Sequence, residues 1–286
     1  MTITITTSNV NGIRAAKRKG IEQWAAKNTP DVWCMQEVRA PQNEIDPIFD
    51  EFGFEYATAG RIADQSGLDR MNEICRIKGR AGVGLLSALP VIDKRYGLPG
   101  LAEDVDSGRW IEADVKTPQG YTVTVVCVYV HAGNTDDPEK MKQKYRFLDT
   151  MLVRMGQLRD EAAHGGKQAV LCGDFNIAHT PLDIKNAKAN EKHAGFLPEE
   201  RAYVDKWLGE LEFVDVMRSL CGDIQGPYTW WSQRGRAFDN NVGWRIDYQF
   251  ATPELAETAR GFVIDKAPTY DLRWSDHAPL SITYDA

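Results

Sequence analysis

Residues 169–183, AVLCGDFNIAHTPLD, join a short apolar run directly to the group Gly-Asp-Phe-Asn. Such a run, closed by a glycine, predicts a buried strand that ends at a turn. Asp174 and Asn176 could then be ordinary turn residues, which is the usual role of a lone acid at a strand end. They could also project from the edge of a sheet toward a shared site. The other strand ends of the chain distinguish the two interpretations.

Length and composition predict one ordinary globular domain. The chain has 286 residues, of which 43% are hydrophobic and 26% charged. It contains no repeat, low-complexity tract or long linker, so we expect a single domain over 1–286. No apolar run approaches the roughly 18 residues of a membrane span, and we expect no membrane partner. The start, MTITITTSNVNG, is typical of a strand and not of a signal peptide.

The cysteines and the net charge indicate in which cellular compartment the protein works and how it could bind a charged partner. The five cysteines are scattered without a Cys-x-x-Cys pair, which favours free thiols in a reducing cytoplasm. The formal net charge of −7 argues against a broad basic surface. A polyanionic partner would therefore need a local basic patch, with metal ions neutralising the acidic site.

Apolar patterning predicts many strands and a few amphipathic helices. The expected helices cover 13–27, 198–211, and a segment from Pro138 to Gly165. Short runs rich in Val, Ile, Tyr or Trp predict strands over 2–8, 31–36, 82–88, 109–115, 121–130, 168–173, 245–251 and 278–284. This combination favours two packed sheets with helices outside.

Polar residues recur where these strands end, and together they have a chemical logic. Glu37 and Asp276 could supply the oxygen ligands that Mg²⁺ prefers. On an extended segment, Asp174 and Asn176 would lie on the same side, suited to orienting a water and donating to a phosphate.

A second pair of residues suggests acid–base chemistry. Asp247 falls within an apolar run, where a buried carboxylate needs a cation, a histidine or a metal as partner. His277, with Asp247 to orient it, would form an acid–base or charge-stabilising dyad. These residue types predict metal-assisted hydrolysis of a phosphate ester.

The motifs SNVNGIRA, QEVR, GVGLLS, GDFNIA, YTWW, NNVGWRIDY and SDHAPL occur in this order. In this they resemble the exonuclease III family of AP endonucleases, within the endonuclease/exonuclease/phosphatase superfamily, from about residue 4 to 283. The resemblance implies a four-layer α/β sandwich, with two mostly antiparallel sheets flanked by helices. It also implies a monomeric Mg²⁺-dependent DNA repair phosphodiesterase, with Mn²⁺ as a substitute.

The implied substrate is double-stranded DNA with abasic sites or blocked 3′ ends. The enzyme would cut 5′ to the abasic site. Its possible additional activities on duplex DNA are those of a 3′–5′ exonuclease, a 3′-phosphatase and a 3′-phosphodiesterase. The alternatives are a phosphoesterase of the same superfamily acting on another substrate, and a catalytically weak DNA-binding member.

Residue roles follow from the same resemblance. Asp174 resembles the residue that positions or deprotonates the attacking water, and Asn176 a donor to the phosphate. Tyr129 resembles a tyrosine that contacts the scissile phosphate or the leaving group, and His277 a phosphate-binding histidine held by Asp247. The implied metal site comprises Glu37 as principal ligand with Asn9, Asn11 and Asp276.

The implied DNA contacts lie outside this cluster. Lys144 matches a lysine that faces DNA, and Trp230 and Phe238 fall where relatives surround an extruded abasic sugar. Trp231 is expected in the core. Basic loops could line one rim of the sandwich or be merely solvated; the candidates for DNA contact are Arg39, Arg76, Lys78 and Arg80.

One position departs from the pattern of the family. After the tyrosine, relatives commonly have Pro, then Asn or Gln, then Gly, whereas this chain runs Tyr129-Val130-His131-Ala132-Gly133. Ala132 cannot make the side-chain contact to phosphate that an amide would make. Either His131 takes over that contact or the grip on the substrate differs.

Overall fold

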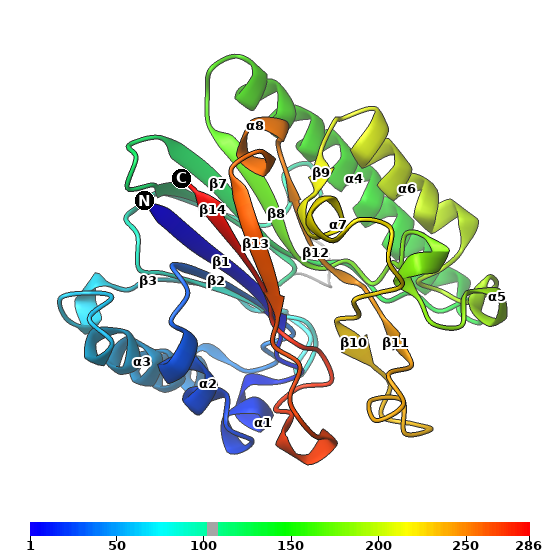
Figure 1. Cartoon of the computed structure of the whole chain (residues 1–286), viewed down its shortest axis with the longest axis horizontal. Coiled ribbons are helices and arrows are strands. Elements are labelled where there is room, and N and C mark those ends of the chain that lie inside the picture. The colour runs from blue at the N-terminus through cyan, green and yellow to red at the C-terminus, as the bar shows by residue number, and fades with distance from the viewer. Residues whose placement is uncertain (102–107) are drawn as a thin grey trace.

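Two six-stranded sheets pack face to face, and helices cover the outer face of each (Figure 1). The computed structural model describes residues 1–101 and 108–286. The architecture is the expected four-layer α/β sandwich, and the strand pairs are mostly antiparallel.

The first sheet has the strand order β13-β14-β1-β2-β4-β3. Its strands are β1 (Thr2–Asn9), β2 (Val32–Gln36), β3 (Asp69–Glu73), β4 (Val83–Ser87), β13 (Ala259–Ile264) and β14 (Leu280–Asp285). β1 is parallel to β2 and antiparallel to β14, so it lies between the second and the last strand of the chain.

The second sheet has the order β5-β6-β7-β8-β12-β9. Its strands are β5 (Val91–Tyr96), β6 (Trp110–Lys116), β7 (Thr122–Tyr129), β8 (Gln168–Asp174), β9 (Val214–Asp215) and β12 (Asp247–Ala251). The parallel pair β7–β8 and the antiparallel pair β8–β12 place Tyr129, Asp174 and Asp247 in one row across three strands. A separate ribbon consists of β10 (Trp230–Trp231) and β11 (Gly243–Trp244).

Three apolar clusters hold the layers together. The inner faces of both sheets meet in one cluster that includes Ile5, Leu85, Val125 and Ile282. The first sheet is covered by α1 (Ile13–Arg18), α2 (Ile21–Asn28) and α3 (Gln42–Thr58). The second is covered by α4 (Pro138–Ala163) and α6 (Pro198–Gly209). The shorter helices are α5 (Ala187–Asn190), α7 (Val216–Cys221), α8 (Pro253–Ala256) and the 3₁₀ turns η1 (Gln65–Gly67), η2 (Pro181–Asp183) and η3 (Tyr270–Leu272).

The eight expected strands are confirmed to within two residues at each end. The single helix expected over 13–27 is wrong, because Gly20 takes a φ of 100° and separates α1 from α2. The other two expected helices are α6 and α4, and Asp137 caps α4 by accepting from the backbone N–H of Lys140. Among the described residues, no helix combines the length and apolarity needed to span a membrane.

Candidate active site

The polar strand ends of both sheets converge on one cavity of about 510 Å³. The second sheet contributes the row that begins with Tyr129 and Asp174, and the first contributes Glu37, Asp276 and His277. Segments that are far apart in sequence are thus brought to one end of the sandwich.

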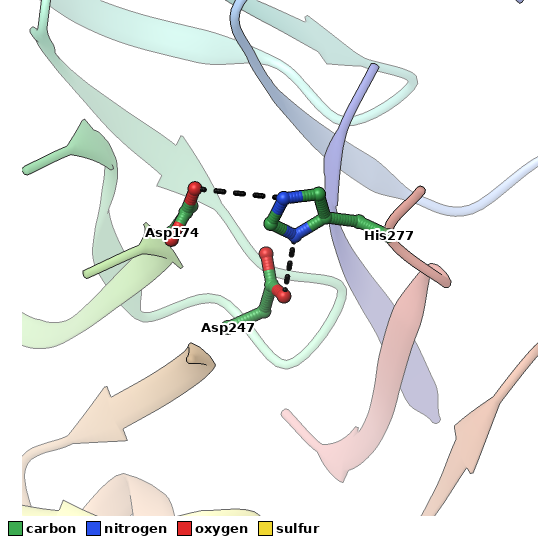
Figure 2. A group of neighbouring side chains, drawn as sticks. All are labelled: Asp174, Asp247 and His277. Carbon is green, nitrogen blue, oxygen red and sulfur yellow. Dashed lines mark hydrogen bonds and ion pairs between the residues drawn. The ribbon is translucent and has the colours of Figure 1, made fainter. Parts of the chain in front are cut away.

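At the floor of this cavity, His277 lies between two buried carboxylates, as Figure 2 shows. Its Nδ1 is 2.9 Å from Oδ2 of Asp247, and its Nε2 is 3.8 Å from Oδ2 of Asp174. Asp247 is the first residue of β12 and has no exposed surface. The histidine is therefore the partner that the burial of Asp247 requires.

Burial and mutual charge shift the pKa values of this group. Burial raises the pKa of Asp174 to about 7, with the charge of Asp247 adding to the effect and His277 opposing it. Burial alone would lower the pKa of His277, but the carboxylates of Asp247 and Asp174 outweigh it and raise the pKa to about 9. Near neutral pH, Asp174 is thus poised to exchange a proton beside a cationic imidazole, as a general base requires.

Asn9 connects the carboxylates of the two sheets. Its Nδ2 donates to Oε1 of Glu37 (3.0 Å) and to Oδ2 of Asp174 (2.9 Å). Its Oδ1 accepts from the backbone N–H of Asn11 at 2.9 Å. In this orientation the Asn9 amide holds the two acids in place, and the amide oxygen faces the backbone. The assignment of Asn9 as a metal ligand stays a prediction.

A second chain of contacts runs along the cavity rim. Nδ2 of Asn11 donates to Oδ1 of Asp276 (2.7 Å), and Oδ1 of Asn11 accepts from Arg39 (2.8 Å). Arg39 also forms an ion pair with Glu37. Burial would raise the pKa of Asp276, but His277 and the hydrogen bond from Asn11 outweigh it and lower the pKa. Asp276 is therefore a carboxylate at neutral pH.

Four residues that line the cavity have a strained backbone conformation. Asn11, Glu37, Arg39 and Asn176 all adopt a left-handed φ, between 46° and 53°. That region is unfavourable for residues other than glycine, least so for asparagine, and such residues gather at functional sites.

The expectation of an extended segment from Asp174 to Asn176 is wrong, because Asn176 folds back. Its backbone N–H donates to Oδ1 of Asp174 (2.9 Å), and its Nδ2 donates to the carbonyl of Val130 (3.0 Å). Both side chains nonetheless line the cavity. The pair closes the strand and also forms part of the site, so the two interpretations of this stretch are compatible.

The oxygen atoms on the Glu37 side of the cavity fit a hard divalent cation. Glu37, Asn11 and Asp276 line it with carboxylate and amide oxygens, the ligands that such ions prefer. The ligand atoms of Asp174, Asp247 and His277 also lie within 4.8 Å of one another. Nδ1 of His277 already forms a hydrogen bond with Asp247. The group of Asp174, Asp247 and His277 is therefore better suited to holding a proton than a metal.

One wall of the cavity is apolar. Trp230, Trp244 and Ile246 line it, and the two indole rings meet edge to face with centroids 5.9 Å apart. Nε1 of Trp230 donates to Oδ2 of Asp276 at 3.2 Å. Sequence reasoning found Trp230 but missed Trp244 and Ile246. Their spacing of two residues, with Arg245 between them, would have indicated one side of an extended chain.

Two residues expected to face DNA lie elsewhere. Lys144 has no exposed surface, and its Nζ forms an ion pair with Glu200 at 2.5 Å. Its place on the buried side of α4 prevents any contact with a ligand in solvent. Phe238 is also buried: it packs against Trp231, with ring centroids 5.4 Å apart, and does not line the cavity.

Of the other four basic residues expected to contact DNA, two line a cavity and two do not. Arg39 and Arg80 line a smaller cavity of about 220 Å³ that adjoins the larger one at Tyr129 and Ala132. Lys140, His131 and Arg109 also line it, and no acid does so among the described residues. Arg76 and Lys78 are exposed in the loop between β3 and β4 and line neither cavity. Sequence reasoning missed Arg109, whose guanidinium lies 4.8 Å from the centroid of the Tyr129 ring.

Comparison with known proteins places this geometry among DNA-processing enzymes. The model of the Endonuclease/Exonuclease/phosphatase family matches residues 6–277. An exodeoxyribonuclease of Bacillus subtilis is 30% identical over 275 residues, which cover 96% of both chains.

Solved structures agree with the sequence matches. An AP endonuclease from Archaeoglobus fulgidus is 29% identical with a TM-score of 0.81, covering 99% of this chain and all of the other. A 3′ phosphatase from Neisseria, bound to a product DNA hairpin, is 27% identical with a TM-score of 0.79 and the same coverage.

Proposed function

This chain belongs to the endonuclease/exonuclease/phosphatase family, and we propose that it is a cation-dependent nuclease that repairs DNA at abasic sites and blocked 3′ ends. It is a hydrolase whose relatives process DNA. The observation that carries the proposal is the buried Asp174–His277–Asp247 group beside an oxygen-rich rim.

Asp174 is the residue that orients and deprotonates the attacking water. Its two oxygens accept from Asn9 and Asn176, which leaves the carboxylate fixed in direction. His277, held by Asp247, donates from Nε2 toward a phosphate oxygen and offsets its negative charge. Tyr129, in the same row of the sheet, faces the phosphate or the leaving oxygen.

Glu37, Asp276 and Asn11 would hold Mg²⁺, or Mn²⁺ in its place, which when bound would supply positive charge to the reacting phosphate. Arg39 forms an ion pair with Glu37, so the negative charge of Glu37 is partly balanced before a cation binds.

The apolar wall supports an abasic sugar as the group admitted to the cavity. Trp230, Trp244 and Ile246 offer carbon surface to a deoxyribose, and they need no hydrogen bonds from a base. An abasic nucleotide is also the easiest to extrude, because it has no base to unstack. The adjoining basic cavity supports a neighbouring stretch of DNA backbone, although the protein as a whole is acidic. We further propose that the enzyme acts as a monomer in the cytoplasm, where its five thiols stay reduced.

The test is a labelled duplex with one abasic analogue, compared with an intact duplex and one that ends in a 3′-phosphate, with and without EDTA. We expect incision at the lesion that requires a divalent cation. Asp174→Ala and His277→Ala should each lower the rate by about a hundredfold or more. The thermal midpoint of Asp174→Ala should change little, since the substitution removes a buried acid, whereas that of His277→Ala should fall, because Asp247 loses its partner. Incision by both variants at near-parental speed would refute the assigned chemistry.

A further inference from the structure

The buried lysine of α4 makes more contacts than an ordinary ion pair. Nζ of Lys144 is 2.9 Å from the carbonyl oxygen of Asn176, 3.2 Å from that of Ala132, and 2.5 Å from Oε1 of Glu200. An ammonium group has three N–H donors, and these three acceptors use all of them.

The partner carboxylate is equally occupied. Oε2 of Glu200, which lies in the first turn of α6, accepts from the backbone N–H groups of Gly195 (2.6 Å) and Leu197 (3.0 Å). Gly195 in turn accepts at its carbonyl from the N–H of Ala178. The ion pair is therefore the centre of a closed network of buried hydrogen bonds.

Three loop segments in this network border the catalytic cavity. The cavity lining includes Ala132 and Gly133 after β7, Asn176 after β8, and 193–195 before α6. We propose that the Lys144–Glu200 pair is a positioning element that fixes these three loops, and through the carbonyl of Asn176 the turn that aims Asp174. The inference rests on the proposed function, because it assigns these loops a role in that reaction.

A comparison within α4 shows why the pair is more than a packing feature. Arg154, on the same helix, forms a largely buried pair with Glu112 of β6, at 2.8 Å for both contacts; Glu112 is fully buried and the Arg154 side chain is 10% exposed. That pair joins a helix to a strand and lines neither of the two cavities described above. It lies ten residues away, about 15 Å along the helix. Arg154 is therefore the matched control for a buried charge without a role in the site.

The experiment compares Lys144→Met and Glu200→Gln with Arg154→Met. We expect Lys144→Met and Glu200→Gln to lower kcat on the abasic duplex by about a hundredfold, the scale of a displacement of about 1 Å in a catalytic group. KM and the salt dependence of KM should stay within threefold of the parental values, because Lys144 does not reach the DNA. Arg154→Met should lose stability to urea while its kcat stays within threefold.

Two outcomes would overturn the inference. One is a folded Lys144→Met enzyme with kcat within threefold of the parental value. The other is a raised KM with a weaker salt dependence, which a DNA-contacting lysine would give. If Lys144→Met does not fold, Glu200→Gln decides, because the Gln oxygen can still accept from Gly195 and Leu197, while the charge and the acceptor that faces Nζ of Lys144 are removed.

A second readout separates this inference from the proposed function. Amide hydrogen exchange at Gly195 and Ala178 should accelerate at least tenfold in Lys144→Met and stay unchanged in Arg154→Met. This measurement needs no substrate. A parental protein without nuclease activity would refute the proposed function, whereas unchanged exchange in Lys144→Met would refute the positioning role.

Discussion

Gly173, directly before Asp174, gives the sharpest test of how the backbone sets the site. In the parallel pairing of β7 and β8 it lies opposite Val128. A Cβ at this position would lie 1.9 Å from the carbonyl oxygen of Val128, and 2.8 Å from its carbonyl carbon. Both obstacles are backbone atoms of a central strand, so no side-chain rotation can relieve the overlap.

The size of the effect of Gly173→Ala follows from these distances. An ordinary contact is 3.4 Å or more, so the strands must separate by about 1.5 Å. Hydrogen bonds on either side of the pair would break, and each unpaired buried group costs about 1–3 kcal/mol. We expect a loss of about 3–5 kcal/mol in the free energy of unfolding. In the fraction that remains folded, the displaced Asp174 should lower kcat by about a hundredfold.

Urea unfolding and incision of the abasic duplex measure the two effects. Gly261→Ala is the control, because it introduces the same methyl group in strand β13 with no heavy atom within 4 Å. It should change the free energy of unfolding by less than about 0.5 kcal/mol and leave kcat unchanged. A Gly173→Ala enzyme that stays within 1 kcal/mol of the parental stability, with kcat within threefold, would show that this reasoning is wrong.

Two further predictions concern the cavity wall and a buried charge network. Trp244→Ala removes part of the apolar wall and leaves the hydrogen bond from Trp230 to Asp276 in place. The value of kcat/KM on the abasic duplex should fall about tenfold, while trimming of an intact 3′ end changes less than threefold. Equal losses on both substrates would contradict the role of the wall. Burial would raise the pKa of Asp183, but Arg245 and Arg218 outweigh it and lower the pKa to about 2. Its carboxylate therefore stabilises the fold above the unfolded pKa, near 4, and the benefit disappears as the pH falls through about 2. Asp183→Asn should cost at least about 2 kcal/mol in urea at pH 7 and clearly less at pH 3, and a deficit that does not depend on pH would refute this.

The acids at strand ends were predictable because they follow apolar runs that the sequence displays directly. Neighbouring parallel strands such as β7 and β8 finish at the same edge, so residues that follow them meet in space. This pairing brings Tyr129 opposite Asp174, whereas the sequence assigned Tyr129 to the site only through the family resemblance. The left-handed turn at Asn176 was harder to predict from the sequence, since Asn tolerates that conformation without requiring it.

Other features had no local signal. Lys144 lies three residues after Met141 on the buried stripe of α4, but a lysine counts as a surface residue unless its partner is known. That partner, Glu200, lies 56 residues further along the chain. The exposed strand β5 lacks apolar alternation because it forms the edge of its sheet. Pro47 concealed α3, since proline usually argues against a helix interior.

The position of β1 between β2 and β14 has a consequence for synthesis of the enzyme. Strand β1 cannot complete its pairing until β14, which follows it far along the chain, has been synthesised. His277 arrives only just before that strand, after every other residue of the buried charged group. A nascent chain that has not reached His277 therefore lacks both the pairing of β1 with β14 and the imidazole of the buried charged group. Under the proposed chemistry, the power to cut DNA appears only once the segment that carries His277 and β14 has been synthesised.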